Sequence, residues 1–316
     1  MRERTLVADI GGTNARFAIY SGAPNKLDMI REYRVADFAT IEDAATAYLD
    51  TIAQKPRSAC FAVAAPVGGD EIAFTNSHWR FRPDDLKSAL GLARFTAVND
   101  FYALAAGAAD FPDNYFAPVK AGAGDAAAPI LVVGPGTGFG VSLIVPFENS
   151  RRIVSTQGGH VAFAPQTADE CEIHSRLAQL YGRVSIERLL SGSGIVDIHR
   201  ALCSKLKLRS DISSAAEISA ASLRGADEIA VKTMNIFFAI LGRAVGDGVL
   251  TTGARGGVIL GGGILPKIRS QLLKSAFVDN FLDKGRMRDY VEPVPIRLIV
   301  RSDAALIGAA AAMEDE

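Results

Sequence analysis

The chain has 316 residues, enough for two domains, and its 49% hydrophobic and 22% charged residues are typical of a globular protein with a sizeable core. With 34 basic and 35 acidic residues the net charge is −1, so electrostatics give no reason to expect a nucleic acid or an anionic membrane as partner. Three widely spaced cysteines without a CxxC pair (Cys60, Cys171 and Cys203) argue against a disulfide framework and are typical of a reducing cytoplasm.

The N-terminal segment and the apolar stretches bear on localisation. Only four uncharged residues separate Arg4 from Asp9, fewer than the apolar part of a signal peptide contains. No stretch comes near the ~20 apolar residues of a membrane span. The Ala-rich segment 304–313 is too short to span and fits a packed helix. We therefore expect a soluble, cytoplasmic protein with no membrane partner.

The first predicted element is a β-hairpin. Largely apolar runs at 6–8 and 15–20 flank Asp9 and Gly11-Gly12-Thr13, which predicts two strands joined by a tight turn. Glycine lets a backbone approach a large anion closely, Thr13 adds a hydroxyl donor, and a carboxylate beside the turn suits hydrated Mg2+. An ordinary Gly-Gly turn explains the residues equally well, so this segment alone leaves both interpretations open.

Strands and helices then alternate up to residue 100, which predicts an α/β fold with some parallel strand pairing. The expected elements are a helix at 41–53, a strand at 58–66 ended by proline, a short strand at 72–79, a helix from Pro83 and a strand at 95–98. Asn99 and Asp100 follow this last strand. By itself, an Asn-Asp pair after a strand is typical of a plain turn.

A second glycine-containing hairpin is predicted in the middle of the chain. The small, polar segment 121–128 is a surface loop near a domain boundary. Beyond it, the apolar run 130–145 is interrupted by glycines, and Gly12-Thr13 aligns with Gly136-Thr137. Asp9 then aligns with Val133, so each half has one such hairpin and only the first has the carboxylate.

The second half is mainly helical from residue 185, with one long amphipathic helix at 228–249. A strand at 257–260 ends in Gly261-Gly262-Gly263, which fits a turn or close helix packing as well as a nucleotide contact. A last strand at 296–300 precedes Asp303, a capping residue for a C-terminal helix.

Two common phosphate-binding motifs are excluded. The chain has no GxxxxGK[ST], and Phe139 stands where the dinucleotide motif GxGxxG needs its third glycine. Two hairpins with glycine turns and one strand that ends in glycines together favour a nucleoside triphosphate held between two domains.

The order of the motifs resembles the sugar-kinase/heat-shock-70/actin superfamily. Asp9–Asn14, Gly136–Gly138 and Gly257–Gly263 match its two phosphate motifs and its adenosine motif in order. Within that superfamily the chain looks like the bacterial glucokinases of the non-ROK type over essentially its whole length. The other matching segments are Thr75–Trp79, Val98–Phe101, Gly158–Val161, Glu187–Gly192 and Asp303–Gly308.

The resemblance implies an α/β, two-domain ribonuclease H-like (actin-like ATPase) fold, with mixed β-sheets flanked by helices and a ligand cleft between the domains. The small α/β domain is expected at 1–110, with a C-terminal helix at about 302–316 packing back on it. The large α/β domain is expected at 111–301. The family resemblance also implies a homodimer.

The implied activity is ATP-dependent phosphorylation of D-glucose at the 6-hydroxyl, giving glucose 6-phosphate and ADP. Asp100 is the implied general base, and Asp9 the residue that holds Mg2+ through water. The implied sugar-binding residues are Asn99, Asp100, Gln157, His160 and Glu187; the implied ATP-binding residues are Ala8, Asp9, Ile10, Gly11, Gly12, Thr13, Asn14, Gly136, Thr137, Gly138, Gly261 and Gly262. The related ROK kinases have a clustered-cysteine zinc motif after the histidine. Here only Cys171 and His174 follow His160, so we expect no zinc.

The sugar-binding residues include one departure from the family. Without the resemblance, His160 after two glycines fits a turn residue, and Glu187 fits the solvated face of a helix. The family pattern Glu-Gly-Gly-His reads Gln157-Gly158-Gly159-His160 here. Glutamine keeps one carbonyl acceptor but loses the charge, so we expect weaker or less selective sugar binding at the anomeric end.

Three other functions compete with this interpretation. A kinase for another hexose, an amino sugar or a short carboxylate would share the glycine turns, and only the set Asn99, Asp100, His160 and Glu187 favours a sugar. A non-enzymatic sugar sensor that regulates transcription needs a DNA-binding module, for which a hairpin at residue 6 leaves no room. A chaperone-like or filament-forming protein of this fold is longer and lacks the sugar motifs. The strictness for glucose, the phosphate donor, the oligomeric state and regulation stay open.

Overall fold

The computed structural model describes residues 4–22, 26–74 and 77–314. The chain divides into two compact units. Unit 1 runs to Tyr115 and adds Ile153–Ser155 and the segment from Arg301 on, and unit 2 comprises Phe116–Arg152 and Thr156–Val300. Thr75 and Asn76, which belong to one of the segments that resemble the family, lie outside the described residues.

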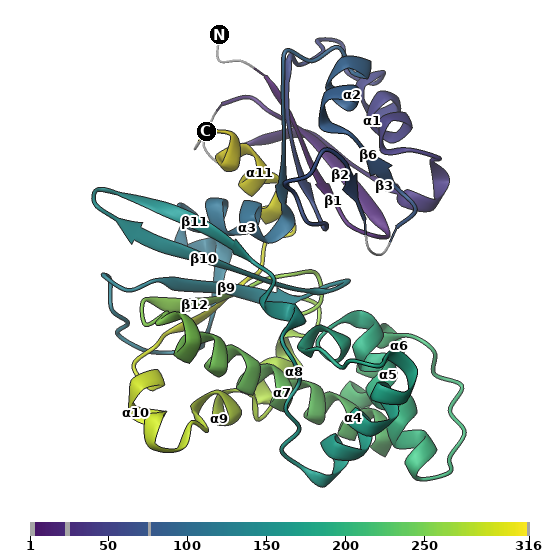
Figure 1. The fold of residues 1–316 in the computed structure, drawn as a ribbon, viewed down its shortest axis with the longest axis vertical. Coiled ribbons are helices and arrows are strands. Elements are labelled where there is room, and N and C mark those ends of the chain that lie inside the picture. Colours follow the sequence, from purple (N-terminus) through teal and green to yellow (C-terminus); the bar gives the residue numbers. More distant parts are fainter. Residues whose placement is uncertain (1–3, 23–25, 75–76, 315–316) are drawn as a thin grey trace. The chain divides into compact units, whose positions relative to one another are not determined.

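Within its described residues, unit 1 has a mixed sheet in the order β3-β2-β1-β4-β7 (Figure 1). β1 (Thr5–Ile10) and β2 (Asn14–Tyr20) form the predicted antiparallel hairpin. β3 (Leu27–Arg34) extends it on one side, and β4 (Ser58–Val63) and β7 (Arg94–Asn99) continue it on the other side, parallel to β1. Because parallel strands end at the same edge of a sheet, the C-terminal ends of β1 and β7 lie at one edge. The short strands β5 (Ile72–Ala73) and β6 (Arg80–Phe81) pair separately.

Both faces of the unit 1 sheet are covered. Alternate residues of β1 belong to different cores: Leu6, Ala8 and Ile10 pack with α1 (Ile41–Leu49) and α2 (Pro83–Ala89). Val7 packs with α3 (Asp100–Ala108) and α11 (Ala304–Glu314). A strand buried on both faces has a continuous apolar sequence, as β1 has.

The helices α3 and α11 cross at two glycines. A Cβ atom on Gly308 would lie 2.0 Å from the carbonyl oxygen of Ala103. A Cβ atom on Gly107 would lie 2.8 Å from the Cα atom of Gly308. The absence of side chains at these positions lets the two backbones touch, and this contact attaches the C-terminal helix to unit 1.

Unit 2 repeats this strand order and adds one strand, so that its described sheet reads β11-β10-β9-β12-β13-β8. β9 (Ile130–Pro135) and β10 (Phe139–Phe147) form the second predicted hairpin. β12 (Gly257–Leu260) runs parallel to β9 and to β13 (Ile296–Ile299), and the edge strands are β11 (Ser150–Thr156) and β8 (Phe116–Lys120).

The turns of the two hairpins differ in length. Residues 11–14 separate the paired Ile10 and Ala15, whereas only residues 136–138 separate the paired Pro135 and Phe139. The two hairpins therefore correspond in topology, but the alignment of Gly12-Thr13 with Gly136-Thr137 does not hold residue by residue.

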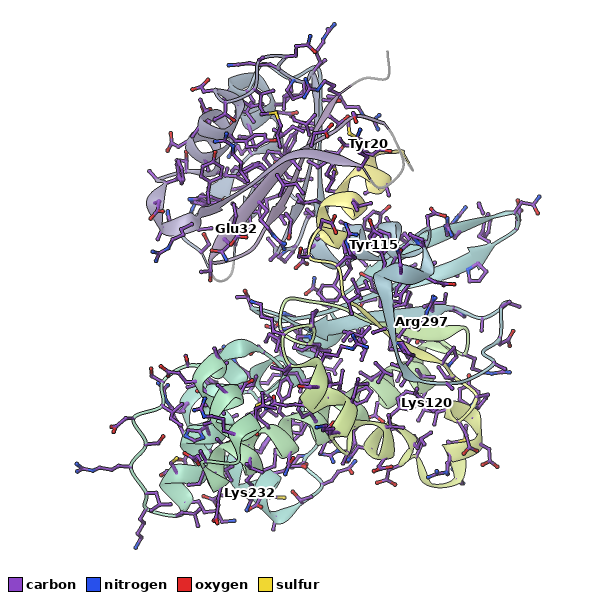
Figure 2. All side chains as sticks on the ribbon, turned by 180° about the vertical axis from the view of Figure 1, so that it is seen from behind. Tyr20, Glu32, Tyr115, Lys120, Lys232 and Arg297 are labelled. Carbon is purple, nitrogen blue, oxygen red and sulfur yellow. The ribbon has the colours of Figure 1, made fainter. Side chains whose placement is uncertain are left out.

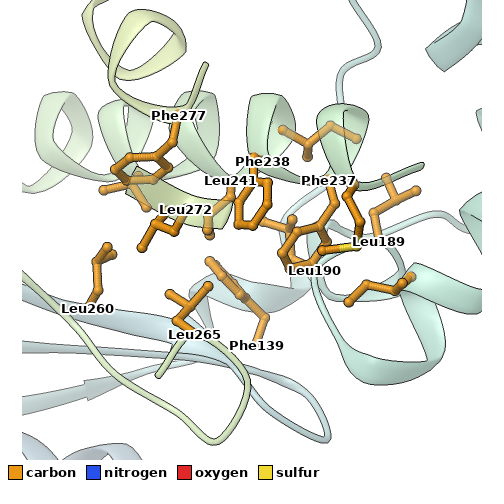
Figure 3. Packing of buried hydrophobic residues seen from close by; sticks show 14 of the residues in the cluster. Phe139, Leu189, Leu190, Phe237, Phe238, Leu241, Leu260, Leu265, Leu272 and Phe277 are labelled. Carbon is orange, nitrogen blue, oxygen red and sulfur yellow. The ribbon is translucent and has the colours of Figure 1, made fainter. Parts of the chain in front are cut away.

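The helical layer of unit 2 is centred on α7 (Glu228–Thr252), the long helix predicted at 228–249. Its Phe237, Phe238 and Leu241 meet Phe139 and Leu265 in one core (Figure 3). By length and composition α7 could cross a membrane, but 61% of its apolar window is buried inside the protein, so α7 is a core helix. The other helices of the unit are α4 (Ala168–Tyr181), α5 (Gly192–Lys205), α6 (Ala215–Arg224), α8 (Arg269–Lys274), α9 (Phe277–Leu282) and α10 (Arg288–Val291).

Some local predictions from the sequence are wrong. α1 ends at Leu49 and not at residue 53, because the N–H groups of Thr51 and Ile52 close separate turns on the carbonyl groups of Tyr48 and Leu49. The sequence pattern does not predict α4, whose buried side chains are too few to form an apolar stripe. Asp303 directly precedes α11, at the predicted capping position, and its carboxylate accepts two hydrogen bonds from Arg301, at 3.0 and 2.7 Å; its capping role stays a prediction.

Charged side chains link the elements of unit 2. Arg243 of α7 donates to Glu170 of α4 at 2.5 Å and to Asn280 of α9 at 2.8 Å. Only 8% of the Arg243 side chain and 2% of the Glu170 side chain are exposed. Lys120, labelled in Figure 2, donates from the end of β8 to backbone carbonyl groups, including that of Val294 at 2.9 Å. Arg243 thus joins three helices, and Lys120 joins β8 to the segment after α10.

Candidate active site

The β1–β2 turn contains the first predicted phosphate motif. The N–H group of Gly11 donates to the carbonyl oxygen of Asn14 at 2.9 Å, which closes the turn. Gly11 and Gly12 are partly exposed, and Thr13 and Asn14 are exposed. The turn therefore presents its backbone to solvent, as contact with an anion requires.

Asp9 lies at the end of β1, opposite Arg16 of β2. The Arg16 guanidinium pairs with Asp9 Oδ2 and also donates to the carbonyl oxygen of Ser302 at 2.5 Å. The Asp9 side chain keeps 15% of its surface exposed. Ala8 and Ile10 are fully buried, so only their backbone groups could reach a nucleotide.

The end of β7 and the start of α3 position Asn99 and Asp100. Asn99 caps the helix: its Oδ1 accepts from the N–H groups of Phe101 at 3.0 Å and Tyr102 at 3.3 Å. Its Nδ2 donates to Ala65 at 3.5 Å, which leaves one amide N–H for a ligand. Asp100 is the first helical residue, and its Oδ1 accepts from Phe101 at 2.9 Å.

The carboxyl groups of Asp9 and Asp100, both in unit 1, have perturbed pKa values. Burial, and after it the negative charge of Asp9, raise the pKa of Asp100 to about 7, although the N–H group of Phe101 acts in the opposite direction. Burial raises the pKa of Asp9 as well, while the Arg16 guanidinium lowers it. A carboxyl group with a pKa near the working pH is suited to accept a proton from a substrate.

In unit 2, the β9–β10 turn packs against the turn after β12. A Cβ atom on Gly134 would lie 2.1 Å from the carbonyl oxygen of Gly261, and one on Gly262 would lie 2.4 Å from that of Pro135. Gly262 also has φ +82°, which favours glycine. The predicted nucleotide segments 136–138 and 261–262 are therefore neighbours, with backbone against backbone.

Three predicted sugar-binding residues lie on two 3₁₀ turns of the same unit. His160 is the last residue of the turn Gly158–His160, and Gln157 directly precedes this turn. Glu187 is in the turn Ile186–Arg188. His160 Nε2 is 3.8 Å from Glu187 Oε1, and 56% of the histidine side chain and 27% of the glutamate side chain are exposed. Gln157 is exposed, and its carbonyl oxygen accepts from the His160 N–H at 2.9 Å.

The predicted residues form two groups. Residues 8–14 with Asn99 and Asp100 belong to unit 1, whereas residues 136–138, Gln157, His160, Glu187, Gly261 and Gly262 belong to unit 2. Two further residues take part that the sequence did not single out. Arg16 could have been found, since strand register puts it opposite Asp9. Phe139, whose N–H holds Glu187 at 2.8 Å, depends on a contact across 48 positions that no local pattern reveals.

The carboxyl oxygens of Asp9 and Asp100 are the groups of the candidate site in unit 1 that could face a metal ion. Among residues 4–22, 26–74 and 77–314, no group of three or more His, Cys, Asp or Glu side chains could hold a metal ion. Asp9 and Asp100 interact and both have raised pKa values, so a nearby cation would lower the cost of ionising them. Mg2+ takes one or two carboxylates, waters and phosphate oxygens, which is the donor set that these residues and a nucleotide would supply.

The sequence matches known proteins over nearly its whole length. The family model described as Glucokinase matches residues 6–316. The glucokinase of Hahella chejuensis is 40% identical over 315 residues, which covers 98% of this chain and 97% of that protein. The glucokinase of Chromobacterium violaceum is 41% identical over 311 residues, covering 98% and 89%.

Solved structures agree with the sequence matches. A glucokinase from an Antarctic psychrotroph has a TM-score of 0.84 at 36% identity and covers 100% of both chains. A glucokinase from Balamuthia mandrillaris, in complex with glucose, has a TM-score of 0.84 at 20% identity and covers 99% of this chain and 94% of that one. At this identity the similarity supports the fold alone. The predicted fold class is confirmed, and with it the predicted family: the chain belongs to the glucokinase family of ATP-dependent hexose kinases.

Proposed function

We propose that the protein transfers the γ-phosphoryl group of ATP to the 6-hydroxyl of D-glucose, with Asp100 as the general base. The observation that best supports this is the Asp100 carboxyl group, held in the first turn of α3 with its pKa raised to about 7. When ionised, it would accept the hydroxyl proton as the sugar oxygen bonds to the γ-phosphorus and ADP leaves. A carboxylate with an ordinary pKa would be a weaker proton acceptor.

The glycine turns are proposed to bind the nucleotide. The N–H groups of Gly11 and Gly136 close their turns on the carbonyl groups of Asn14 and Gly138. The other backbone N–H groups of the turns 11–14 and 136–138 would bind the phosphates, because fixed uncharged donors neither repel a cation nor need to reorganise. Gly261 and Gly262 would contact the adenosine, which their position against Gly134 and Pro135 supports. The domain division at 1–110 with about 302–316, and at 111–301, is part of this proposal.

Asp9 is proposed to hold Mg2+ through water. When bound, Mg2+ supplies positive charge that neutralises the β- and γ-phosphates. Arg16 pairs with one oxygen of Asp9, which orients the carboxylate and favours its ionised form against the effect of burial, and the other oxygen would face a water ligand. We expect no zinc.

The sugar hydroxyls are proposed to bind Asn99, Asp100, Gln157, His160 and Glu187. Asn99 would use its one remaining amide N–H, because its oxygen caps α3. Glu187 and His160 are side by side, so a carboxylate acceptor and an imidazole nitrogen could address neighbouring hydroxyl groups.

A coupled assay tests the proposal. ADP release is measured with ATP-Mg and a panel of glucose, mannose, fructose, glucosamine and short carboxylates. We expect glucose to be the best acceptor, with glucose 6-phosphate identified as the product by its dehydrogenase. Absence of hexose phosphorylation would overturn the proposal, and a better acceptor elsewhere in the panel would identify a kinase for another hexose.

One observation keeps the other-hexose alternative open. The family glutamate is replaced by Gln157, whose exposed side chain brings no negative charge to the sugar site. A neutral acceptor binds a hydroxyl about half as strongly as a charged one. Discrimination between hexoses that differ near the anomeric end is therefore expected to be weak.

Restoring the charge should tighten glucose binding. We expect Gln157→Glu to lower the glucose KM about 5- to 10-fold, the value of roughly 1 kcal/mol gained by charging one hydrogen bond. Gln54→Glu, an equally exposed glutamine of unit 1, is the matched control for the added charge. A glucose KM that stays the same or rises in Gln157→Glu contradicts the role of this position.

We further propose a cytoplasmic homodimer. Three cysteines that form no disulfide support the compartment. The dimer is carried over from the family resemblance, and sedimentation of the purified protein tests it.

A further inference from the structure

Gly138, the last residue of the β9–β10 turn, lies against the carboxylate of Glu187, one of the proposed sugar-binding side chains. A Cβ atom on Gly138 would lie 2.3 Å from Oε2 and 3.0 Å from Cδ of Glu187. A Cβ atom on Gly136, two residues earlier in the same turn, would meet only the backbone nitrogen of Gly263, at 3.9 Å. Gly138 therefore has no room for a side chain beside Glu187, whereas Gly136 has, although both belong to the predicted phosphate motif.

The Glu187 carboxylate is held in a defined orientation. Its Oε2 accepts from the N–H group of Phe139 at 2.8 Å, and its Oε1 faces His160 Nε2 at 3.8 Å. One oxygen is thus engaged by the protein, and the other points toward the exposed imidazole. Oε1 accepts no hydrogen bond from the described residues and is therefore the oxygen that we consider available to a ligand.

The group that holds Glu187 is itself rigid. The Phe139 side chain is buried in the core of unit 2 with Leu190 and Leu265 (Figure 3). The Phe139 carbonyl oxygen lies only 2.2 Å from the position of a Cβ atom on Gly159, in the turn that carries His160. The backbone of Phe139 therefore connects the β9–β10 turn (residues 136–138, the phosphate turn) with the two sugar-binding turns, Gly158–His160 and Ile186–Arg188.

Further backbone hydrogen bonds connect the phosphate turn with the two sugar-binding turns. The N–H group of Gly192, after the Glu187 turn, donates to the carbonyl oxygen of Gly136 at 3.0 Å. The N–H group of Ile186 donates to Val161, next to His160, at 3.0 Å. The phosphate turn and the two sugar-binding turns cannot move independently while these bonds are intact.

We propose that Gly138 is a positioning residue for the sugar: its missing side chain lets the Glu187 carboxylate dock on the phosphate turn and present Oε1 to the acceptor. This inference rests on the proposed function. In this arrangement Glu187 links acceptor binding to the phosphate turn, so glucose and nucleotide should strengthen each other's binding.

The substitution Gly138→Ala should displace the carboxylate. The new Cβ atom would lie 2.3 Å from Oε2, so the carboxylate would have to move, which would break the hydrogen bond to Phe139 and turn Oε1 away from His160. Loss of an oriented charged hydrogen bond weakens glucose binding by about 10- to 100-fold. The effect should appear without nucleotide, which a residue that served only the phosphates would not show.

Isothermal calorimetry of glucose binding without nucleotide tests this, together with the KM for ATP. We expect the glucose Kd to rise about 10- to 100-fold in Gly138→Ala. In Gly136→Ala we expect a changed KM for ATP and a glucose Kd within about 2-fold of wild type. In a Glu187→Ala background, Gly138→Ala should weaken glucose binding no further, because its effect runs through Glu187.

A fourth variant covers the case in which Gly138→Ala does not fold. Glu187→Asp withdraws the carboxylate by one methylene, so Gly138→Ala should fold in that background and change glucose Kd little. A wild-type glucose Kd in Gly138→Ala, or additive effects of Gly138→Ala and Glu187→Ala, would overturn the inference and leave the proposed function intact. A wild-type protein that binds and phosphorylates no hexose would overturn both.

Discussion

Replacing Asp100 by asparagine should reduce kcat about 10²- to 10⁴-fold, the usual contribution of a general base, while glucose binding is largely retained. The amide has nearly the shape of the carboxylate but cannot accept a proton. The measurements are the coupled assay and calorimetric glucose binding. Turnover near the wild-type rate would exclude Asp100 as the base.

If Asp100 is the base, the same carboxyl group should set the pH dependence of activity. Because its pKa is raised to about 7, kcat/KM should fall as the pH drops below about 7, where the free enzyme holds the proton. A cation bound beside Asp9 would counter the negative charge that helps to raise this pKa. The acid limb of kcat should therefore lie at lower pH than that of kcat/KM.

Asp100 also affects stability. Its folded-state pKa of about 7 exceeds the ordinary value of 3.8, so between these values the folded state binds more protons than the unfolded state. Stability consequently falls as the pH rises through this window, by at most about 4 kcal/mol at 1.36 kcal/mol for each pKa unit. Asp100→Asn should be more stable than wild type at pH 8 and equal to it at pH 3. The exposed Asp70→Asn is the control whose stability should follow wild type at every pH.

The second large effect concerns the buried pair Arg243 and Glu170. We expect Arg243→Met to lower the free energy of unfolding by about 3–5 kcal/mol, because Glu170 would be left as an uncompensated buried charge. Asn280 would also lose the donor that lies 2.8 Å from its Oδ1. Urea unfolding followed by circular dichroism measures the loss.

Two controls separate the charge from the packing. Arg243→Met combined with Glu170→Leu removes both charges and should recover most of the stability. Arg176→Met breaks the pair with Glu172 on α4, whose side chains are 34% and 40% exposed, and should cost less than about 1 kcal/mol. Equal losses in Arg176→Met and Arg243→Met would contradict a burial effect.

The sequence was most informative where a local pattern determines the structure. The hairpins at 5–20 and 130–147 follow from apolar runs around glycine turns, and α7 follows from its helical spacing. Helix α4 could not be predicted because its buried face includes Glu170, whose partner Arg243 is 73 positions away. A charged residue inside a core has no signature in a hydrophobic pattern.

For the candidate site, too, the sequence predicted only what local patterns determine. The motifs identified Asn99 and Glu187, but not what holds them. Asn99 is a helix cap, which residue type and position after a strand do suggest. Glu187 is oriented by the Phe139 N–H, and Gly134 is pressed against Gly261, both by contacts between distant parts of the chain. Such contacts exist only once unit 2 has folded.

The glycine crossing of α3 and α11 has a consequence for biosynthesis. Residues 304–314 are translated after all of unit 2, although they cover the face of unit 1 that contains Val7, Ala18 and Cys60. The apolar face of unit 1 therefore stays uncovered until the whole chain has been made. Although its first strands are translated first, unit 1 can be completed only by the last segment, and in that interval its uncovered apolar face is where chaperones would bind.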